Sequence, residues 1–481
     1  MVEARTTTGR VRGTVEDVPV FRGIPFAQPP VGAWRFAAPT PPRPWDGVRE
    51  ALAFGPPPPQ ADAFGMNQLA GGDDWLTLNV WSPDPSPGAA LPVMVWIHGG
   101  AYTIGTSGLP EYDGARLARD GVVLVTFNYR VGVEGFAHIA GAAANRGLLD
   151  QVAALEWVRD NIRAFGGDPA RVTVFGQSAG GGSVGALLAM PRAAGLFGRA
   201  VAQSVPGTFF TPELAGDIAG ACAAELGLKP TVADLSAVDP ELLCAAADEV
   251  TANIGAHVER WGPPAHRSIL FAPVVDGAVL PNTPWEARHG VDLLVGHTRD
   301  EHRLFTALEE VTEEQAATAV EVFAPGPYPA AEPVALYEWV LSDWLFRMPS
   351  LHLAERAAGA VHFYELTWSG VLGACHGLDV PLVFGNLTSG LPATLIDDLA
   401  AAEAVSAHMR AAWIAFATNG DPGWPPFDSG LVQIFDADPV VAPYPEVESR
   451  KIWRDHTFAP LPLRTSQAFP DAARRAGRAM R

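Results

Sequence analysis

Residues 171–180 constrain the fold of this 481-residue chain more than any other stretch. Four apolar or β-branched residues, 172–175, predict a buried strand. The pattern Gly-x-Ser-x-Gly follows at once, centred on Ser178, and small residues and leucines at 181–190 then predict a helix. A sharp turn between a strand and a helix exposes a serine hydroxyl above the sheet, where it can act as a nucleophile.

A second match to the same pattern lies directly behind the first and is centred on Ser183. Ser183 has no strand before it and falls in the first turns of the predicted helix. We therefore predict Ser178 as the nucleophile. The glycines at 176 and 180 would let the strand and the helix cross closely, because they carry no Cβ.

Apolar strands and helices alternate on both sides of this turn. Residues 76–81, 92–97 and 122–127 predict strands, and residues 148–165 predict an amphipathic helix that stops at Gly166-Gly167. Such alternation favours an α/β fold with a largely parallel sheet. No linker or repeat divides the chain, so we expect one domain over residues 1–481.

Composition excludes several classes of function. The net charge of −20 disfavours a nucleic-acid partner, because the phosphate backbone would be repelled. The chain has three cysteines, no apolar leader at its start and no apolar run of membrane-spanning length. These features predict a cytoplasmic protein without a membrane span. We expect a monomer or a weak dimer.

The strand 92–97 ends in His98-Gly99-Gly100-Ala101, a loop of small residues. Consecutive N–H groups in such a loop can point at one spot and bind an anion. A plain tight turn is the alternative interpretation. The place of the loop, after an apolar strand and upstream of Ser178, favours an oxyanion hole, with His98 as the residue that orients the loop.

Further motifs make residues 9–204 resemble the type-B carboxylesterases, a branch of the α/β-hydrolases. The motifs that carry this resemblance are Phe21-Arg22-Gly23-Ile24-Pro25-Phe26-Ala27, Leu76-Thr77-Leu78-Asn79-Val80-Trp81, Asn128-Tyr129-Arg130-Val131-Gly132, Asn145-Arg146-Gly147-Leu148-Leu149-Asp150-Gln151, Phe165-Gly166-Gly167-Asp168-Pro169, the 98–101 loop and the 176–180 turn. The resemblance implies a single α/β-hydrolase catalytic domain with a large, mostly parallel twisted sheet flanked by helices. It also implies helical insertions that form a lid or gorge wall, a small-molecule ester substrate, and no metal or cofactor.

The resemblance also implies the partners of Ser178. Residues 291–296 predict a strand followed by the carboxylates Asp300 and Glu301. The residue pattern alone leaves both open as the acid, and the family motif implies Glu301. His376 lies in a glycine-flanked loop at the place of the family's catalytic histidine, and Cys375 beside it is interpreted as a packing residue.

The implied oxyanion donors are the N–H groups of Gly100, Ala101 and Ala179, with Gly99 shaping the loop. With them, the triad Ser178-His376-Glu301 would hydrolyse carboxylic esters through an acyl-enzyme.

Several positions depart from the family pattern, and others are expected to line the pocket. Gln177 stands where the family most often has glutamate, so we expect neutral rather than cationic esters. His302 replaces a glycine and could narrow the space behind the acid. We expect Arg35 to pair with Asp73 in place of an absent disulfide. The pocket residues we propose are Gln177, Phe209, Phe210 and Trp261, with core packing as the alternative for the aromatic three, and segment 302–370 is expected to supply gorge-lining helices.

Two other functions stay open at this point. The same triad could hydrolyse a carbamate or an amide as its physiological bond. A non-catalytic binding module of the same fold is more remote, because Ser178, Glu301 and His376 are all retained.

Overall fold

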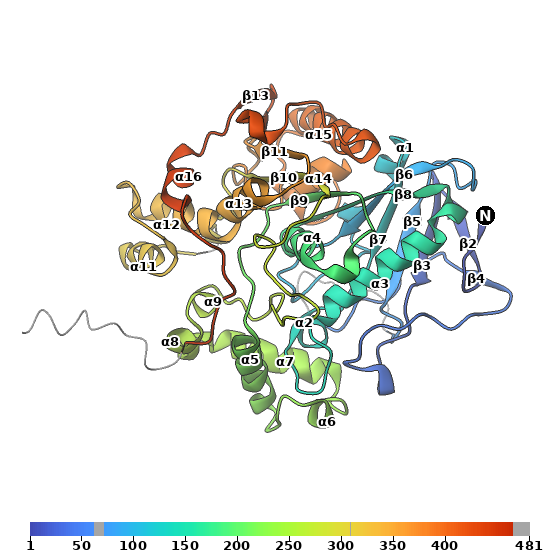
Figure 1. Ribbon diagram of the computed structural model, residues 1–481, viewed down its shortest axis with the longest axis horizontal. Helices are drawn as coiled ribbons and strands as arrows, with labels where there is room; N and C mark the ends of the chain where they lie inside the picture. Colours follow the sequence, from blue (N-terminus) through green and yellow to red (C-terminus); the bar gives the residue numbers. More distant parts are fainter. Residues whose placement is uncertain (62–71, 308, 465–481) are drawn as a thin grey trace, which may run out of the picture.

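The computed structural model describes residues 1–61, 72–307 and 309–464. Its strands form one 13-stranded mixed sheet in the order β1-β2-β3-β5-β7-β6-β8-β9-β10-β11-β12-β13, with β4 paired to β2 (Figure 1). The strands are β1 (Val2–Arg5), β2 (Arg10–Val15), β3 (Pro19–Pro25), β4 (Val48–Glu50), β5 (Thr77–Trp81), β6 (Leu91–Ile97), β7 (Val123–Phe127), β8 (Gly167–Gln177), β9 (Arg199–Gln203), β10 (Asp292–Thr298), β11 (Val361–Leu366), β12 (Leu431–Phe435) and β13 (Val440–Pro443).

Helices cover both faces of this sheet and extend beyond its ends (Figure 1). They are α1 (Ala115–Arg119), α2 (Gly132–Phe136), α3 (Arg146–Asn161), α4 (Ala179–Ala189), α5 (Pro212–Glu225), α6 (Val232–Leu235), α7 (Pro240–Ala252), α8 (Val258–Trp261), α9 (Pro263–His266), α10 (Arg303–Thr306), α11 (Glu313–Phe323), α12 (Pro333–Ser342), α13 (Met348–Arg356), α14 (Asp379–Phe384), α15 (Leu399–Asn419) and α16 (Val447–Trp453), with a π-helical turn, Asp343–Arg347, between α12 and α13.

The predicted elements form where the apolar pattern placed them. The strands predicted at 76–81, 92–97, 122–127 and 171–175 are β5, β6, β7 and β8. The helix predicted over 148–165 is α3 followed by a short 3₁₀ turn, and it ends at Gly166, whose φ of 84° is left-handed. Glycine adopts that conformation without a steric penalty, which is why the helix stops there.

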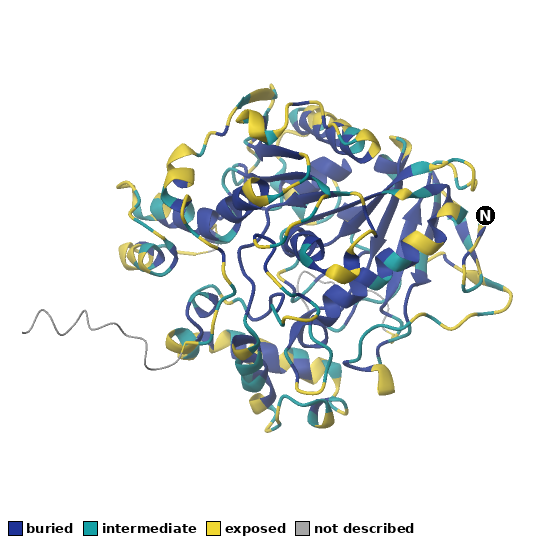
Figure 2. Cartoon of the chain, viewed as in Figure 1, coloured by how far each residue is buried: buried dark blue, intermediate teal, exposed yellow. Residues whose placement is uncertain are grey.

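Alternating residues of the central strands supply two separate cores. In β6, Val93 and Val95 face a core that includes residues of α3 and α4. Met94 and Trp96 face the opposite side, where Trp413 of α15 belongs to the same core. Figure 2 shows the central strands buried and the outer helices exposed on their outward sides. A parallel sheet covered on both faces favours apolar residues throughout. β6 is wholly apolar, and β7 is apolar except at Thr126, whose hydroxyl donates to the carbonyl oxygen of Ser107.

The middle of the sheet places four loops at one edge. Strands β7, β6, β8, β9, β10, β11 and β12 run parallel to one another in that order. Loops after the carboxyl ends of parallel strands therefore emerge together. The loops after β6, β8, β10 and β11 carry His98, Ser178, Glu301 and His376 respectively.

One predicted contact is wrong. The guanidinium of Arg35 pairs with Glu134 at 2.6 Å rather than with Asp73, and both paired side chains are almost fully buried. Glu134 comes from α2, 99 residues away. Glu134 is the favoured partner because a buried guanidinium without a counter-charge would destabilise the fold.

No helix within the three described ranges is both long and apolar enough to cross a membrane.

Candidate active site

Ser178 occupies the turn between β8 and α4 in a strained backbone conformation. Its φ is 58° and its ψ is −126°, values that side-chain-bearing residues rarely adopt. A Cβ added to Gly180 would lie 2.0 Å from the carbonyl oxygen of Ile97, and one added to Gly176 would lie 2.6 Å from the backbone of Gly180. The strand and the helix therefore cross as closely as the two glycines predicted.

The competing serine is part of the core. Ser183 is fully buried in α4, and its hydroxyl accepts a hydrogen bond from the side-chain amide of Gln151 at 2.9 Å. Ser178, in contrast, is partly exposed. Only Ser178 of the two is placed where a substrate could reach it.

The glycine loop lies against the serine because β6 pairs with β8, Ile97 opposite Gly176. A Cβ added to Gly99 would come within 3.2 Å of the Cβ of Ser178. Gly100 and Ala101 have φ values of 114° and 53°, which turn the chain tightly here. Among the backbone hydrogen bonds of the described loops, none is donated by the N–H of Gly100 or Ala101. In the described part of the chain these two N–H groups thus have no backbone acceptor, and their role as oxyanion donors stays a prediction.

His98 supports this loop from beneath. Its ring stacks on Tyr129 at a centroid distance of 4.3 Å, and its Nδ1 lies 2.8 Å from the carbonyl oxygen of Gly99. The Tyr129 hydroxyl donates to the carbonyl oxygen of His98. Complete burial lowers the pKa of His98 to about 4, so the ring is neutral at ordinary pH.

Glu301 is fully buried at the end of β10 and contacts the imidazole of His376. Its Oε2 lies 2.5 Å from Nδ1 of His376. Its Oε1 accepts hydrogen bonds from the Ser204 hydroxyl at 2.6 Å and from the Thr298 N–H at 2.9 Å. Burial acts to raise the pKa of Glu301, but the imidazole and these donors hold that pKa below its ordinary value.

Asp300, the other candidate acid, has different partners. Its carboxylate contacts Arg299 at 3.0 Å and Arg303 at 3.3 Å, and it accepts the N–H of Ala374 at 3.0 Å. The structure therefore brings Glu301, and not Asp300, to the histidine.

His376 projects from the loop after β11 with both ring nitrogens occupied. In the neutral tautomer that donates from Nδ1 to Glu301, Nε2 is left as an acceptor for the side-chain amide of Gln177, whose nitrogen lies 3.1 Å away. Within the described residues no hydrogen bond joins Nε2 to the hydroxyl of Ser178, the neighbour of Gln177. Contacts of this kind often tighten only when substrate binds.

Three further residues lie around this histidine and its acid. The Phe346 ring stacks on His376 at a centroid distance of 4.1 Å, and Phe305 lies 5.5 Å from it. Ser204, with a left-handed φ of 52°, donates to Glu301 from the end of β9. Phe305 and Phe346 belong to segment 302–370, which the sequence predicts to be gorge-lining. Ser204 was not predicted, and its only signal in the sequence is its place just after an apolar strand.

The remaining predicted residues lie in packed surroundings. Cys375 is buried, and burial raises the pKa of its thiol to about 12, in keeping with a packing role. His302 is buried against Thr306, Phe305 and Tyr337.

The three aromatic residues proposed for the pocket are almost fully buried. Phe209 packs edge-on against Trp285, the backbone of Phe210 is bridged to Val274, and Trp261 stacks on His257. These contacts are typical of core residues, and a pocket role for them stays a prediction. In the part of the chain that the structure describes, no three His, Cys, Asp or Glu side chains are grouped to hold a metal ion.

Comparisons with known proteins agree over most of the chain. A sequence model described as the carboxylesterase family matches residues 2–325. The para-nitrobenzyl esterase of Bacillus subtilis is 38% identical, over 93% of this chain and 97% of that protein. A phenmedipham hydrolase of Pseudarthrobacter oxydans is 35% identical, over 88% of this chain and 92% of that protein. A solved structure of a PNB esterase superposes with a TM-score of 0.83 at 37% identity, covering 93% of this chain and 98% of the other.

Proposed function

The chain belongs to the carboxylesterase family and is a carboxylic-ester hydrolase, and from this premise we propose that it cleaves neutral esters through an acyl-enzyme on Ser178. The α/β-hydrolase fold predicted from the sequence is confirmed by the solved relatives. The observation that carries the proposal is the 2.5 Å contact between Nδ1 of His376 and Oε2 of Glu301, at the sheet edge where Ser178 emerges.

The proposed reaction begins when the Ser178 oxygen attacks the carbonyl carbon of the ester. Its proton passes to Nε2 of His376, and the carbonyl electron pair moves onto the oxygen. Glu301 keeps the imidazole oriented and stabilises its charged form. For this step Nε2 exchanges the amide of Gln177 for the hydroxyl of Ser178.

The N–H groups of Gly100, Ala101 and Ala179 are the proposed donors to the new oxyanion, and Gly99 leaves room for them. Each donor of this kind is typically worth about 10²–10³ in rate. Collapse of the tetrahedral intermediate breaks the bond to the alcohol, which takes the proton from Nε2. A water molecule then repeats the cycle on the acyl-enzyme and frees the acid.

The preference for neutral esters is supported by the groups around His376. Gln177 brings an uncharged amide next to Nε2, and Phe346 and Phe305 present apolar rings to the same imidazole. Both phenylalanines come from segment 302–370, which supports the proposal that this segment lines the way to Ser178. Apolar walls favour uncharged, apolar acyl or alcohol groups.

A carbamate or amide hydrolase is the second candidate, because a serine triad can attack those carbonyl carbons as well. The printed names of two relatives, each 35% identical to this chain, leave the bond open: one is a phenmedipham hydrolase, and the other, from Sphingopyxis macrogoltabida, is a fumonisin B1 esterase.

A panel of para-nitrophenyl esters of increasing acyl length, with one aryl carbamate and one anilide, separates these candidates. We expect the highest kcat/KM for an ester. A carbamate or anilide that exceeds every ester would replace the proposal with the second candidate.

We also propose one catalytic domain and a cytoplasmic location. The location is supported by Cys222, Cys244 and Cys375, which are all free thiols. Cell fractionation with an activity assay tests it, and activity confined to the culture medium would contradict it.

A further inference from the structure

We propose that Asp300 is a positioning residue that fastens the loop carrying His376 to the end of the strand carrying Glu301. The inference rests on the proposed triad and gives Asp300 a part in it. Glu301 touches the imidazole, whereas Asp300 acts on the backbone that presents the imidazole.

Backbone hydrogen bonds join the two loops. The N–H of Asp300 donates to the carbonyl oxygen of Ala374 at 2.9 Å, and Asp300 pairs with Cys375 as in a parallel sheet. The N–H of His376 donates to the carbonyl oxygen of Glu301 at 3.3 Å. Residues 374–376 thus take the place of β11 beside the residues that follow β10, since β11 itself pairs with β10 only as far as Leu366.

The carboxylate of Asp300 adds a second hydrogen bond to Ala374. Its Oδ2 accepts the N–H of Ala374 at 3.0 Å, so Ala374 is held on both its N–H and its carbonyl side. Ala374 stands two residues before His376. A shift at Ala374 would move the imidazole relative to Glu301, whose 2.5 Å contact tolerates little displacement.

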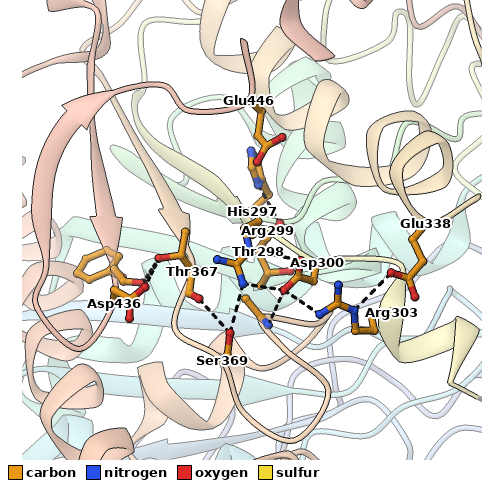
Figure 3. Close-up of polar contacts among 12 residues, drawn as sticks. His297, Thr298, Arg299, Asp300, Arg303, Glu338, Thr367, Ser369, Asp436 and Glu446 are labelled. Carbon is orange, nitrogen blue, oxygen red and sulfur yellow. Dashed lines mark hydrogen bonds and ion pairs between the residues drawn. The ribbon is translucent and has the colours of Figure 1, made fainter. Parts of the chain in front are cut away.

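Two arginines hold the carboxylate of Asp300 in place (Figure 3). Arg299 contacts it at 3.0 Å and extends to the Ser369 hydroxyl, while Arg303 contacts it at 3.3 Å and extends to Glu338 of α12. Burial acts to raise the pKa of Asp300, but Arg299 and the other donors hold it below its ordinary value, so the carboxylate is ionised. Charge-assisted contacts of this kind are stronger and more directional than neutral ones.

Gly373 lies close against the side chains of Asp300 and Arg303. Its φ is 70°, and an added Cβ would lie 2.4 Å from the guanidinium of Arg303 and 2.7 Å from Oδ2 of Asp300. The chain can approach these charged groups only because the residue next to Ala374 is a glycine.

The substitution Asp300→Ala tests the proposal through kcat and KM for one para-nitrophenyl ester. We expect kcat to fall about 10- to 100-fold, because small displacements of a catalytic group have effects of that size. KM should stay within about twofold, since Asp300 touches no proposed pocket residue. An unchanged kcat, or a rise in KM that accounts for the whole loss, would overturn the proposal.

Two variants serve as controls. Asp300→Asn keeps an oxygen for the N–H of Ala374 and should retain more activity than Asp300→Ala. This variant keeps the proposal testable if Asp300→Ala fails to fold. Asp436→Ala removes a carboxylate at the same sheet edge that contacts Thr367 instead of the loop (Figure 3). It should leave kcat unchanged. Equal losses in Asp436→Ala and Asp300→Ala would mean a general disturbance of this edge.

A double-mutant cycle separates positioning from simple structural loss. If Asp300 acts through the imidazole, Asp300→Ala has no further effect on turnover in a His376→Ala background. The same fold-loss in both backgrounds would overturn the proposal. Ser178→Ala is measured alongside: residual turnover there would refute the triad itself, whereas an inactive Ser178→Ala with a fully active Asp300→Ala would refute only the role of Asp300.

Discussion

The side-chain amide nitrogen of Gln177 lies 3.1 Å from Nε2 of His376. Because Nδ1 of the same ring donates to Glu301, the amide N–H is the group that Nε2 can accept in the resting enzyme. A glutamate at position 177 would have no N–H to donate and would bring a negative charge to the same place. The residue before Ser178 therefore sets both the contact that Nε2 makes here and the charge beside it.

Replacing Gln177 by glutamate should shift substrate preference toward cations. A carboxylate a few ångströms from the substrate attracts a positive group, so the ratio of kcat/KM for a cationic ester to that for a neutral ester of equal size should rise about tenfold or more. Both esters are measured at low ionic strength, where screening is weakest.

Gln315→Glu supplies the matched control. It adds the same charge at the third residue of α11, where the capping box accepts glutamate as well as glutamine. Its ratio should equal that of the wild type. A ratio that is also unchanged in Gln177→Glu would refute the charge explanation.

Asp379, the first residue of α14, should make stability depend on pH. It is fully buried, and burial raises its pKa from 3.8 to about 6. Between these values the folded protein holds a proton that the unfolded chain has lost, so the stabilisation is complete below about pH 4 and disappears as pH rises through about 6.

The substitution Asp379→Asn removes this dependence while keeping an oxygen for the amide of Gln203. Relative to wild type, its free energy of unfolding should rise by about 3 kcal/mol between pH 4 and pH 7. Urea unfolding at a series of pH values measures the difference. A difference that is constant across that range would contradict the prediction.

Gly180 should tolerate no larger residue. An alanine Cβ there would lie 2.0 Å from the carbonyl oxygen of Ile97, and forcing strand and helix apart should cost about 2 kcal/mol or more. Gly220 of α5 has open space around its Cβ position, so Gly220→Ala should stabilise by about 0.5–1 kcal/mol through helix propensity. The denaturant midpoints of the two variants measure these effects. If both midpoints shift in the same direction, the close crossing of strand and helix is not what excludes a larger residue at position 180.

The turn at Ser178 could be predicted because everything that forms it is local. A short apolar strand, two glycines four residues apart and a helix-forming run lie within 20 residues. Local sequence also showed that Ser183 falls inside the helix, and the structure buries it against Gln151.

Contacts between distant segments could not be predicted in the same way. Glu301 and His376 are 75 residues apart, and only the family resemblance paired them. The bond from Ser204 to Glu301 depends on the register of β9 beside β10, which no residue pattern specifies. Arg35 was assigned the wrong partner for the same reason, because Glu134 reaches it from α2.

The role of Ser178 is tested most directly by hydrolysis of a para-nitrophenyl ester by Ser178→Ala and by Ser183→Ala. We expect no turnover above the uncatalysed rate for Ser178→Ala, with a wild-type melting profile. Ser183→Ala should retain turnover, with a stability loss of about 1–3 kcal/mol from the unpaired amide of Gln151. Retained turnover in Ser178→Ala, or loss of turnover in a folded Ser183→Ala, would refute Ser178 as the nucleophile.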